Sequence, residues 1–204
     1  MSVGGRDANR HGWNSLDKHL QTQEKHLEDR VGGFVLAYRL QAASVSWRQG
    51  GRRRQQFDGA RKYRVSGRVV CRHGLFIQVD KTLEVNAERQ SRTIAYSYHA
   101  AVRGPQDRPI FRYDNAHRYA GHLDSHHRHR FDCWTWREIG QPVWVGEGQW
   151  PHLSDVVDEL DEWWEREGRF LGLVVPDDDD ESDWWGGSDT GDGSRVSPGP
   201  TPRR

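Results

Sequence analysis

Hydrophobic and polar residues alternate along residues 63–79, and this period of two is the pattern of a strand with one buried face. One alternating run ends at Cys71 and the next begins at Leu75, with His73-Gly74 between them, which predicts a hairpin. β-branched and aromatic residues predict further strands at 93–102 and 110–113, separated by Gly104-Pro105. The simplest assembly is an antiparallel meander of about four to five strands.

A second pattern, with helical spacing, covers residues 153–167. Its apolar positions recur at i, i+3, i+4, i+7, i+10 and i+11, at Leu153, Val156, Val157, Leu160, Trp163 and Trp164. Pro151 precedes this segment and Gly168 follows it, as expected at the two ends of a helix. Packing the apolar stripe on one face of the meander predicts an α+β fold in which both tryptophans belong to the core.

The remaining segments give weaker signals. Residues 15–30 suggest a short helix with Ser15 as its N-cap, and 170–175 suggest a last short strand. We therefore expect an N-terminal extension over 1–60, partly helical or disordered, an α+β domain over 61–175, and a disordered acidic tail over 176–204. The tail contains the run Asp177–Asp180 and is rich in Gly, Ser and Pro.

The formal net charge is zero, but the charges are unevenly divided along the chain. Residues 1–38, 39–137, 138–175 and 176–204 carry 0, +12, −7 and −5. The basic block suits a phosphate-rich ligand, and the acidic end could bind that block, shield it or solvate the chain. Arginine greatly outnumbers lysine, which suits bidentate phosphate contacts but is equally the result of GC-rich coding.

Several protein classes are excluded or disfavoured by composition. No apolar run reaches the ~18 residues of a membrane span, and residues 1–12 lack the apolar core of a signal peptide. We therefore expect a cytoplasmic protein without membrane association. Cys71 and Cys133 have no CxxC partner, so we expect two buried thiols and neither a zinc-thiolate site nor a disulfide framework.

Histidine is concentrated in one stretch. Five of the eleven histidines lie between positions 117 and 129, namely His117, His122, His126, His127 and His129. Such a group could supply acid and base, bind a transition metal or change charge with pH. His127 and His129 share a face if the segment is extended, whereas His122 and His126 share one only in a helix. Because no carboxylate or cysteine supports the spacing, no metal or other cofactor is favoured.

Two tracts upstream supply further candidate residues. Tyr96-Ser97-Tyr98-His99 and Phe111-Arg112-Tyr113-Asp114-Asn115 are expected on adjacent strands. Asp114 is explained by a strand-ending turn, or it orients a neighbouring imidazole while Arg112 holds a phosphate. His99 could equally be a hydrogen-bonded structural residue.

These tracts, together with Ser125-His126-His127-Arg128-His129 and the helix starting at Trp150-Pro151-His152-Leu153, resemble the motif blocks of the TumE family. The resemblance covers about residues 63–165. It implies a small toxin of a bacterial or archaeal toxin-antitoxin pair, encoded beside a winged-helix antitoxin called TumA. The chain departs from the family pattern at Ala116-His117-Arg118 and at Ser125, where the family has Pro or paired His. The resemblance implies no established reaction.

Our leading hypothesis is a toxin-like protein that cleaves RNA without a metal, since the 2′-OH of RNA is its own nucleophile and needs only a base, an acid and cations. His99 and either His127 or His129 would be the acid and base, without an assignment of which is which, with Arg112 the phosphate clamp and Asp114 the orienter. Substrate-binding candidates are Tyr98 or Tyr113 for stacking, with Asn115 and Arg128.

Two alternatives belong to other classes. The five clustered histidines could hold a metal in a nuclease or another hydrolase, or the basic sheet could dock a partner without catalysis. In a fourth interpretation the histidine cluster is a hydrogen-bonded loop without a ligand. The sequence does not indicate an oligomeric state.

Overall fold

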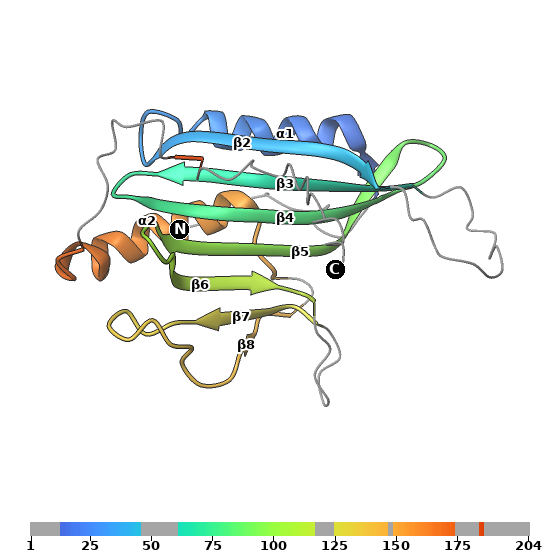
Figure 1. The fold of residues 1–204 in the computed structure, drawn as a ribbon. Coiled ribbons are helices and arrows are strands. Elements are labelled where there is room, and N and C mark those ends of the chain that lie inside the picture. The colour runs from blue at the N-terminus through green and yellow to red at the C-terminus, as the bar shows by residue number, and fades with distance from the viewer. Residues whose placement is uncertain (1–12, 46–60, 117–124, 147–148, 174–183, 186–204) are drawn as a thin grey trace, which may run out of the picture.

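An antiparallel sheet of eight strands forms the centre of the structure, a computed structural model that describes residues 13–45, 61–116, 125–146, 149–173 and 184–185 (Figure 1). Seven strands follow in the order β2-β3-β4-β5-β6-β7-β8, and β1 pairs with the start of β5. The strands are β1 (Asn14–Ser15), β2 (Val35–Val45), β3 (Arg61–Cys71), β4 (Leu75–Val85), β5 (Gln90–Val102), β6 (Arg108–Asp114), β7 (His127–Arg130) and β8 (Val143–Trp144).

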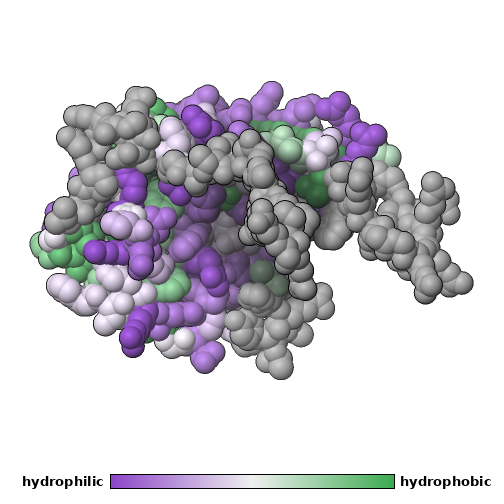
Figure 2. All heavy atoms as spheres, viewed as in Figure 1, coloured by the Kyte–Doolittle hydropathy of each residue, from purple (hydrophilic) through white to green (hydrophobic). Residues whose placement is uncertain are grey.

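Both helices lie on the same face of this sheet, behind the strands in Figure 1. α1 (Leu16–Glu28) contributes Leu27 to the core, and α2 (Leu153–Arg166) contributes the stripe that ends at Leu160. A 3₁₀ turn, η1 (Gly168–Phe170), follows α2. The alternate residues of β4 from Leu75 to Val85 are buried toward the helices. Figure 2 shows the opposite, open face of the sheet, where hydrophilic residues gather over the middle strands.

The hairpin and the long helix form where the sequence pattern predicts them. β3 and β4 are joined by His73 and Gly74, whose φ angles of 63° and 65° are those of a two-residue hairpin turn. α2 begins at Leu153, with Asp155 accepting a hydrogen bond from the His152 backbone N–H. α1 has the predicted cap, since the Ser15 side chain accepts from the Lys18 N–H. The α+β class with an antiparallel sheet is therefore confirmed.

The number of strands exceeds the four to five expected, and the difference has a physical cause. β7 reads His-Arg-His-Arg and contains no apolar residue, so the hydrophobic pattern gave no sign of it. β2 lies in the region expected to be an extension, yet it pairs with β3 from Val35 to Val45. The boundary at residue 61 was therefore wrong for the sheet, which includes β2 and is covered by α1.

The C-terminal expectations have mixed outcomes. The strand expected over 170–175 is not seen in its described part: Phe170 ends the 3₁₀ turn, residues 171–173 form no strand, and 174–175 lie outside the described residues. Most of the tail predicted to be disordered also lies outside them. Trp184 and Trp185 are described and are ordered against the open face: Trp184 is 9% exposed beside β3 and β4, and the Trp185 ring lies under the Arg39 guanidinium at 4.4 Å. Disorder was therefore the wrong prediction for these two residues.

A buried polar pair lies between α1 and the sheet. The Lys81 Nζ atom is 2.8 Å from His19 Nε2, and Lys81 is only 5% exposed. Burial lowers the pKa of Lys81 to about 8. The pKa of His19 falls to about 3, first through burial and then through the charge of Lys81. The imidazole therefore stays neutral and accepts a hydrogen bond from the amine.

No helix in the described part of the chain combines the length and the apolar character that crossing a membrane requires.

A close approach of backbones at Gly67 fixes β2 against β3. Gly67 has φ of +152°, and a Cβ built there would lie 1.9 Å from the carbonyl oxygen of Arg39. We expect Gly67→Ala to lower the free energy of unfolding by about 2 kcal/mol or more, because a rigid backbone group cannot yield to the methyl group. Urea unfolding followed by circular dichroism measures this.

The matched control is Gly104→Ala, whose Cβ would have only an ordinary contact of 3.5 Å with the Gln106 carbonyl oxygen. Equal stability of the two variants would show that β2 does not pack on β3 in this register.

Candidate functional site

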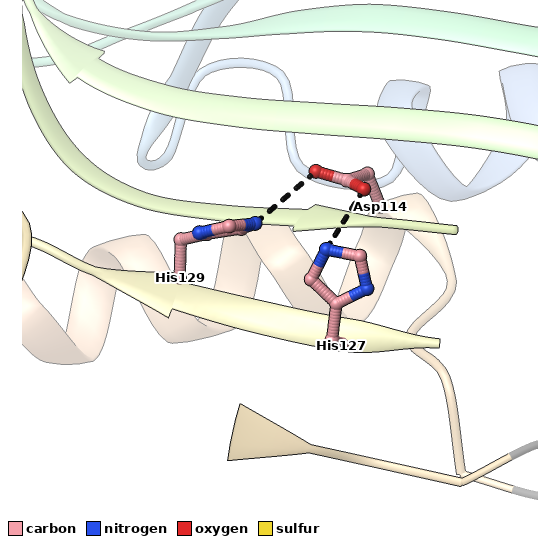
Figure 3. A group of neighbouring side chains, drawn as sticks. All are labelled: Asp114, His127 and His129. Atoms are coloured by element: carbon pink, nitrogen blue, oxygen red, sulfur yellow. Dashed lines mark ion pairs between the residues drawn. The ribbon is translucent and has the colours of Figure 1, made fainter. Parts of the chain in front are cut away.

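The candidate site lies on the open face, where β6 and β7 pair. Arg112 is the Cα partner of His129, and Asp114 is the partner of His127. Because neighbouring residues of a strand point to opposite faces, these four side chains share the face that the helices leave open. Figure 3 shows both imidazoles directed toward the Asp114 carboxylate, with the helices behind the strands. The extended conformation that places His127 and His129 on one face is thus confirmed.

The carboxylate of Asp114 is the centre of this cluster, and the residue is only 3% exposed. Its Oδ2 atom accepts from Arg112 Nε at 2.7 Å. Its Oδ1 atom accepts from the Ala116 N–H at 3.1 Å and lies 3.0 Å from Nε2 of His127. Asp114 therefore caps the turn after β6, as one interpretation predicted, and also contacts Arg112 and His127; its role as an orienter stays a prediction.

His129 is held through both ring nitrogens. Its Nδ1 atom lies 2.5 Å from Oε1 of Glu138, and its Nε2 atom lies 2.9 Å from Nη2 of Arg112. Arginine only donates hydrogen bonds, so Nε2 is the acceptor and the proton is on Nδ1, where it is donated to Glu138. This arrangement fixes the orientation and the tautomer of the ring.

His127 is completely buried and pairs differently. Its Nδ1 atom lies 2.6 Å from the carbonyl oxygen of Ser125, so Nδ1 is the donor. Its Nε2 atom faces Oδ1 of Asp114 in an ion-pair contact, which is attractive when Nε2 carries a proton. The rings of His127 and His129 lie edge to face with centroids 4.8 Å apart.

His99 extends the cluster onto β5, where it is the Cα partner of Arg112. Arg112 therefore lies between two imidazoles, His99 on one side and His129 on the other. Burial lowers the pKa of His99, and the charge of Arg112 lowers it further, while Asp107 opposes both effects. Within the described chain, Nε2 of His99 has no hydrogen-bond partner.

Three of the predicted substrate-binding residues lie on the other face, against α2. Tyr98 is 1% exposed and Tyr113 is 8% exposed. The Tyr113 hydroxyl donates to Glu159 of α2 at 2.8 Å, and the Arg128 guanidinium forms an ion pair with the same carboxylate. Burial raises the pKa of both tyrosines. The strand alternation separates these residues from Asp114, so they cannot offer a stacking surface at the cluster.

Asn115 stabilises the end of β6. Its Oδ1 atom accepts from the Tyr96 N–H at 2.9 Å, and its Nδ2 atom donates to the Ile94 carbonyl oxygen at 3.2 Å. The amide group is therefore engaged by the backbone of β5, and its position supports the fold.

The three described histidines of the cluster, His126, His127 and His129, do not form one ligand set. His126 stacks on Tyr96 and Trp150 on the helix side, and His117 and His122 lie outside the described residues. In the described part of the chain, a metal-ligating arrangement is instead formed by Asp114, His127 and His129, whose ligand atoms all lie within 4.8 Å of one another. Two histidines and one carboxylate suit a divalent transition metal.

Glu138 was not predicted from the sequence as a residue of the site. It stands outside the motif blocks, in a loop that returns to β7 through a bridge between Phe131 and Glu138. Only the folded loop places its carboxylate against His129, and a lone glutamate in an irregular segment gives no sequence signal.

The contacts of His129 make a spectroscopic prediction. In long-range ¹H–¹⁵N spectra of the neutral ring, we expect the proton on Nδ1, because Glu138 accepts it and Arg112 donates to Nε2. The variant Glu138→Ala should remove this preference. A ring that carries its proton on Nε2 in the unmodified protein would contradict the assigned contacts.

Comparison with known proteins places the chain in a family. None of the curated proteins matches it, and neither does any solved structure. The sequence model of the family described as "Toxin TumE" matches residues 39–165, a range that begins within β2, ends within α2 and includes every residue of the cluster. Since this match covers more than half of the chain, the chain belongs to the TumE toxin family.

Proposed function

We propose that this protein is the toxin of a toxin-antitoxin pair and that it cleaves RNA without a metal, with Arg112 binding the scissile phosphate between His99 and His129. The observation that carries the proposal is the order of these three side chains, which are successive Cα partners on β5, β6 and β7. Partners on neighbouring strands have Cβ atoms about 5 Å apart, so a phosphate on the guanidinium lies within reach of an imidazole on either side.

His99 is the base in this mechanism. Its lowered pKa keeps the ring neutral near pH 7. Within the described chain its Nε2 atom forms no hydrogen bond that would have to break before it accepts a proton. Nε2 accepts the proton of the 2′-OH while the 2′-oxygen attacks phosphorus.

His129 is the acid. Its Nδ1–H is donated to Glu138, which holds the ring with Nε2 directed at Arg112. The Arg112 side chain is 33% exposed, so its guanidinium can reach a ligand. When Arg112 turns from Nε2 of His129 to the phosphate, Nε2 becomes available to the substrate. The P–O5′ bond breaks as Nε2–H protonates the leaving 5′-oxygen, which leaves a 2′,3′-cyclic phosphate and a 5′-hydroxyl.

Asp114 and His127 position these groups without touching the substrate. Asp114 holds Arg112 through Nε, and this contact leaves the N–H groups on Nη1 and Nη2 for other acceptors, of which His129 is one. His127 supports Asp114 from a buried position.

Membership of a toxin family implies an antitoxin partner. We infer that this partner is a winged-helix protein of the TumA type and that both proteins act in the cytoplasm, where RNA is the substrate.

A second candidate is metal-dependent hydrolysis, favoured by the convergence of Asp114, His127 and His129. We prefer the metal-free mechanism because the Arg112 guanidinium already supplies a cation to two of these three residues, Asp114 and His129.

Cleavage of RNA in EDTA separates the two candidates. We expect the purified protein to degrade total RNA in excess EDTA, whereas His99→Ala and His129→Ala lower the rate at least about 100-fold, the usual contribution of an acid or a base. The control His26→Ala removes an imidazole from α1 and should retain full activity. Intact RNA with the unmodified protein in EDTA, and cleavage restored by Mn²⁺ or Zn²⁺, would contradict the metal-free mechanism.

The pH dependence of cleavage tests the role of His99. Burial and the charge of Arg112 lower its pKa, so the acidic limb of kcat/KM should have its midpoint below about 6.5, the ordinary value for histidine. Arg112→Gln removes the cation, so the midpoint of its residual activity should move upward. A midpoint that stays unchanged in Arg112→Gln would show that His99 is not the base.

A further inference from the structure

A row of side chains crosses the open face well beyond the candidate site. The register of the sheet makes each member the Cα partner of the next, from β2 to β7: Arg39, Arg68, Gln78, His99, Arg112 and His129. Cα partners point to the same face, and neighbouring strands lie about 4.8 Å apart, so the row is roughly 24 Å long. It runs straight from β2 through the proposed catalytic residues.

The net charge of this row is positive. It contains three guanidinium groups and no carboxylate. Within the described chain, Arg39 and Arg68 form no ion pair with a carboxylate. Two other arginines of the same face are neutralised, because Arg64 Nε donates to Asp80 at 2.9 Å and Arg92 Nε donates to Glu84 at 2.8 Å. Arg39 and Arg68 are therefore the two arginines of the row without a carboxylate partner in the described chain, whereas Arg112 is paired with Asp114.

Flat aromatic groups accompany the cations at the β2 end. The Arg39 guanidinium lies 4.4 Å from the ring centre of Trp185, and the Arg68 guanidinium lies 4.2 Å from that of Phe76. Stacked guanidinium and indole groups are surfaces on which unpaired bases stack, whereas the bases of a duplex are already stacked on one another.

Buried donors without acceptors lie beside Arg68. The Nε and Nη1 atoms of Arg103 and the Nε1 atom of Trp184 are buried and have no hydrogen-bond partner within the described chain. Both residues line a small cavity together with Arg68 and Phe76. Burial is the main cause that lowers the pKa of Arg68; the Arg103 charge adds to it and Asp107 opposes it. A partly buried guanidinium beside a second cation favours an anionic ligand rich in acceptor oxygens.

We propose that this row binds a segment of single-stranded RNA. Arg68 and Arg39 hold phosphates adjacent to the scissile one, and a base stacks at the Trp185 end of the row. This inference rests on the proposed function, since it assigns the nucleotides that flank the bond cleaved between His99 and His129. It names the substrate class as single-stranded RNA read through its backbone and the faces of its bases.

Binding of an oligonucleotide that cannot be cleaved tests the row independently of catalysis. The probe is a fluorescent 12-residue 2′-O-methyl RNA, which lacks the nucleophilic hydroxyl, and its affinity is measured by anisotropy at several salt concentrations. We expect Arg39→Gln and Arg68→Gln each to weaken binding about tenfold at low salt and to reduce the slope of log K against log salt by about one.

Matched controls are Arg64→Gln and Arg92→Gln, which remove the same charge from the same face but from arginines already paired with carboxylates. They should change the affinity less than about twofold. Equal losses in all four variants would show a diffuse charge effect and would overturn the row, as would equal affinity for a duplex of the same sequence. A polyglutamate peptide serves as a second probe. If Arg39→Gln and Arg68→Gln weaken the binding of this peptide but leave RNA binding unchanged, the row binds an acidic protein segment and the proposal is overturned.

The same variants distinguish this inference from the proposed function. Cleavage of ordinary RNA together with unchanged probe affinity in Arg68→Gln would refute the row and leave the catalytic assignment standing. Tight, Arg68-dependent probe binding without cleavage of ordinary RNA would refute the catalytic assignment and leave the row standing.

Discussion

The alternation of side chains along β5, β6 and β7, in one fixed register, is the constraint on which the rest of the structure depends. Tyr113 and Asp114 are neighbours in the chain, yet one packs under α2 and the other is the centre of the open-face cluster. A shift of register by one residue would bury the charged set under the helices and expose the aromatic set. The core that α2 forms with the sheet therefore also fixes where His99, Arg112 and His129 meet.

The polar side chains of β7 can be buried because other residues of the cluster form hydrogen bonds and ion pairs with them. His127 and His129 are almost inaccessible, and a buried polar group without a partner costs on the order of 1–3 kcal/mol. Asp114, Glu138 and Arg112 supply the partners that offset this cost. Arg112 binds Asp114 and His129 and is also the proposed phosphate ligand. The same guanidinium is therefore needed for the stability of the cluster and for the proposed activity.

The two faces of the sheet also divide the charges of the chain. On the helix side, carboxylates of α2 neutralise arginines: Asp158 pairs with Arg30, and Glu159 pairs with Arg128. On the open face, Arg39 and Arg68 have no such partner within the described chain, although Arg64 and Arg92 do. The zero net charge of the polymer thus conceals a basic row on one face, which is the feature that supports a polyanionic substrate.

The sequence by itself determined the hairpin, α1 with its Ser15 cap, α2 and the α+β class, because each depends on a local period, cap or turn. It also singled out His99, Arg112, Asp114, His127 and His129 as candidates by residue type and motif, and the register places them on one face. Only the tertiary structure decided that Tyr98, Tyr113 and Arg128 face α2 and that Glu138 holds His129. It alone placed β7 in the sheet. These outcomes depend on register and on long-range polar pairing, which leave no periodic trace along the chain.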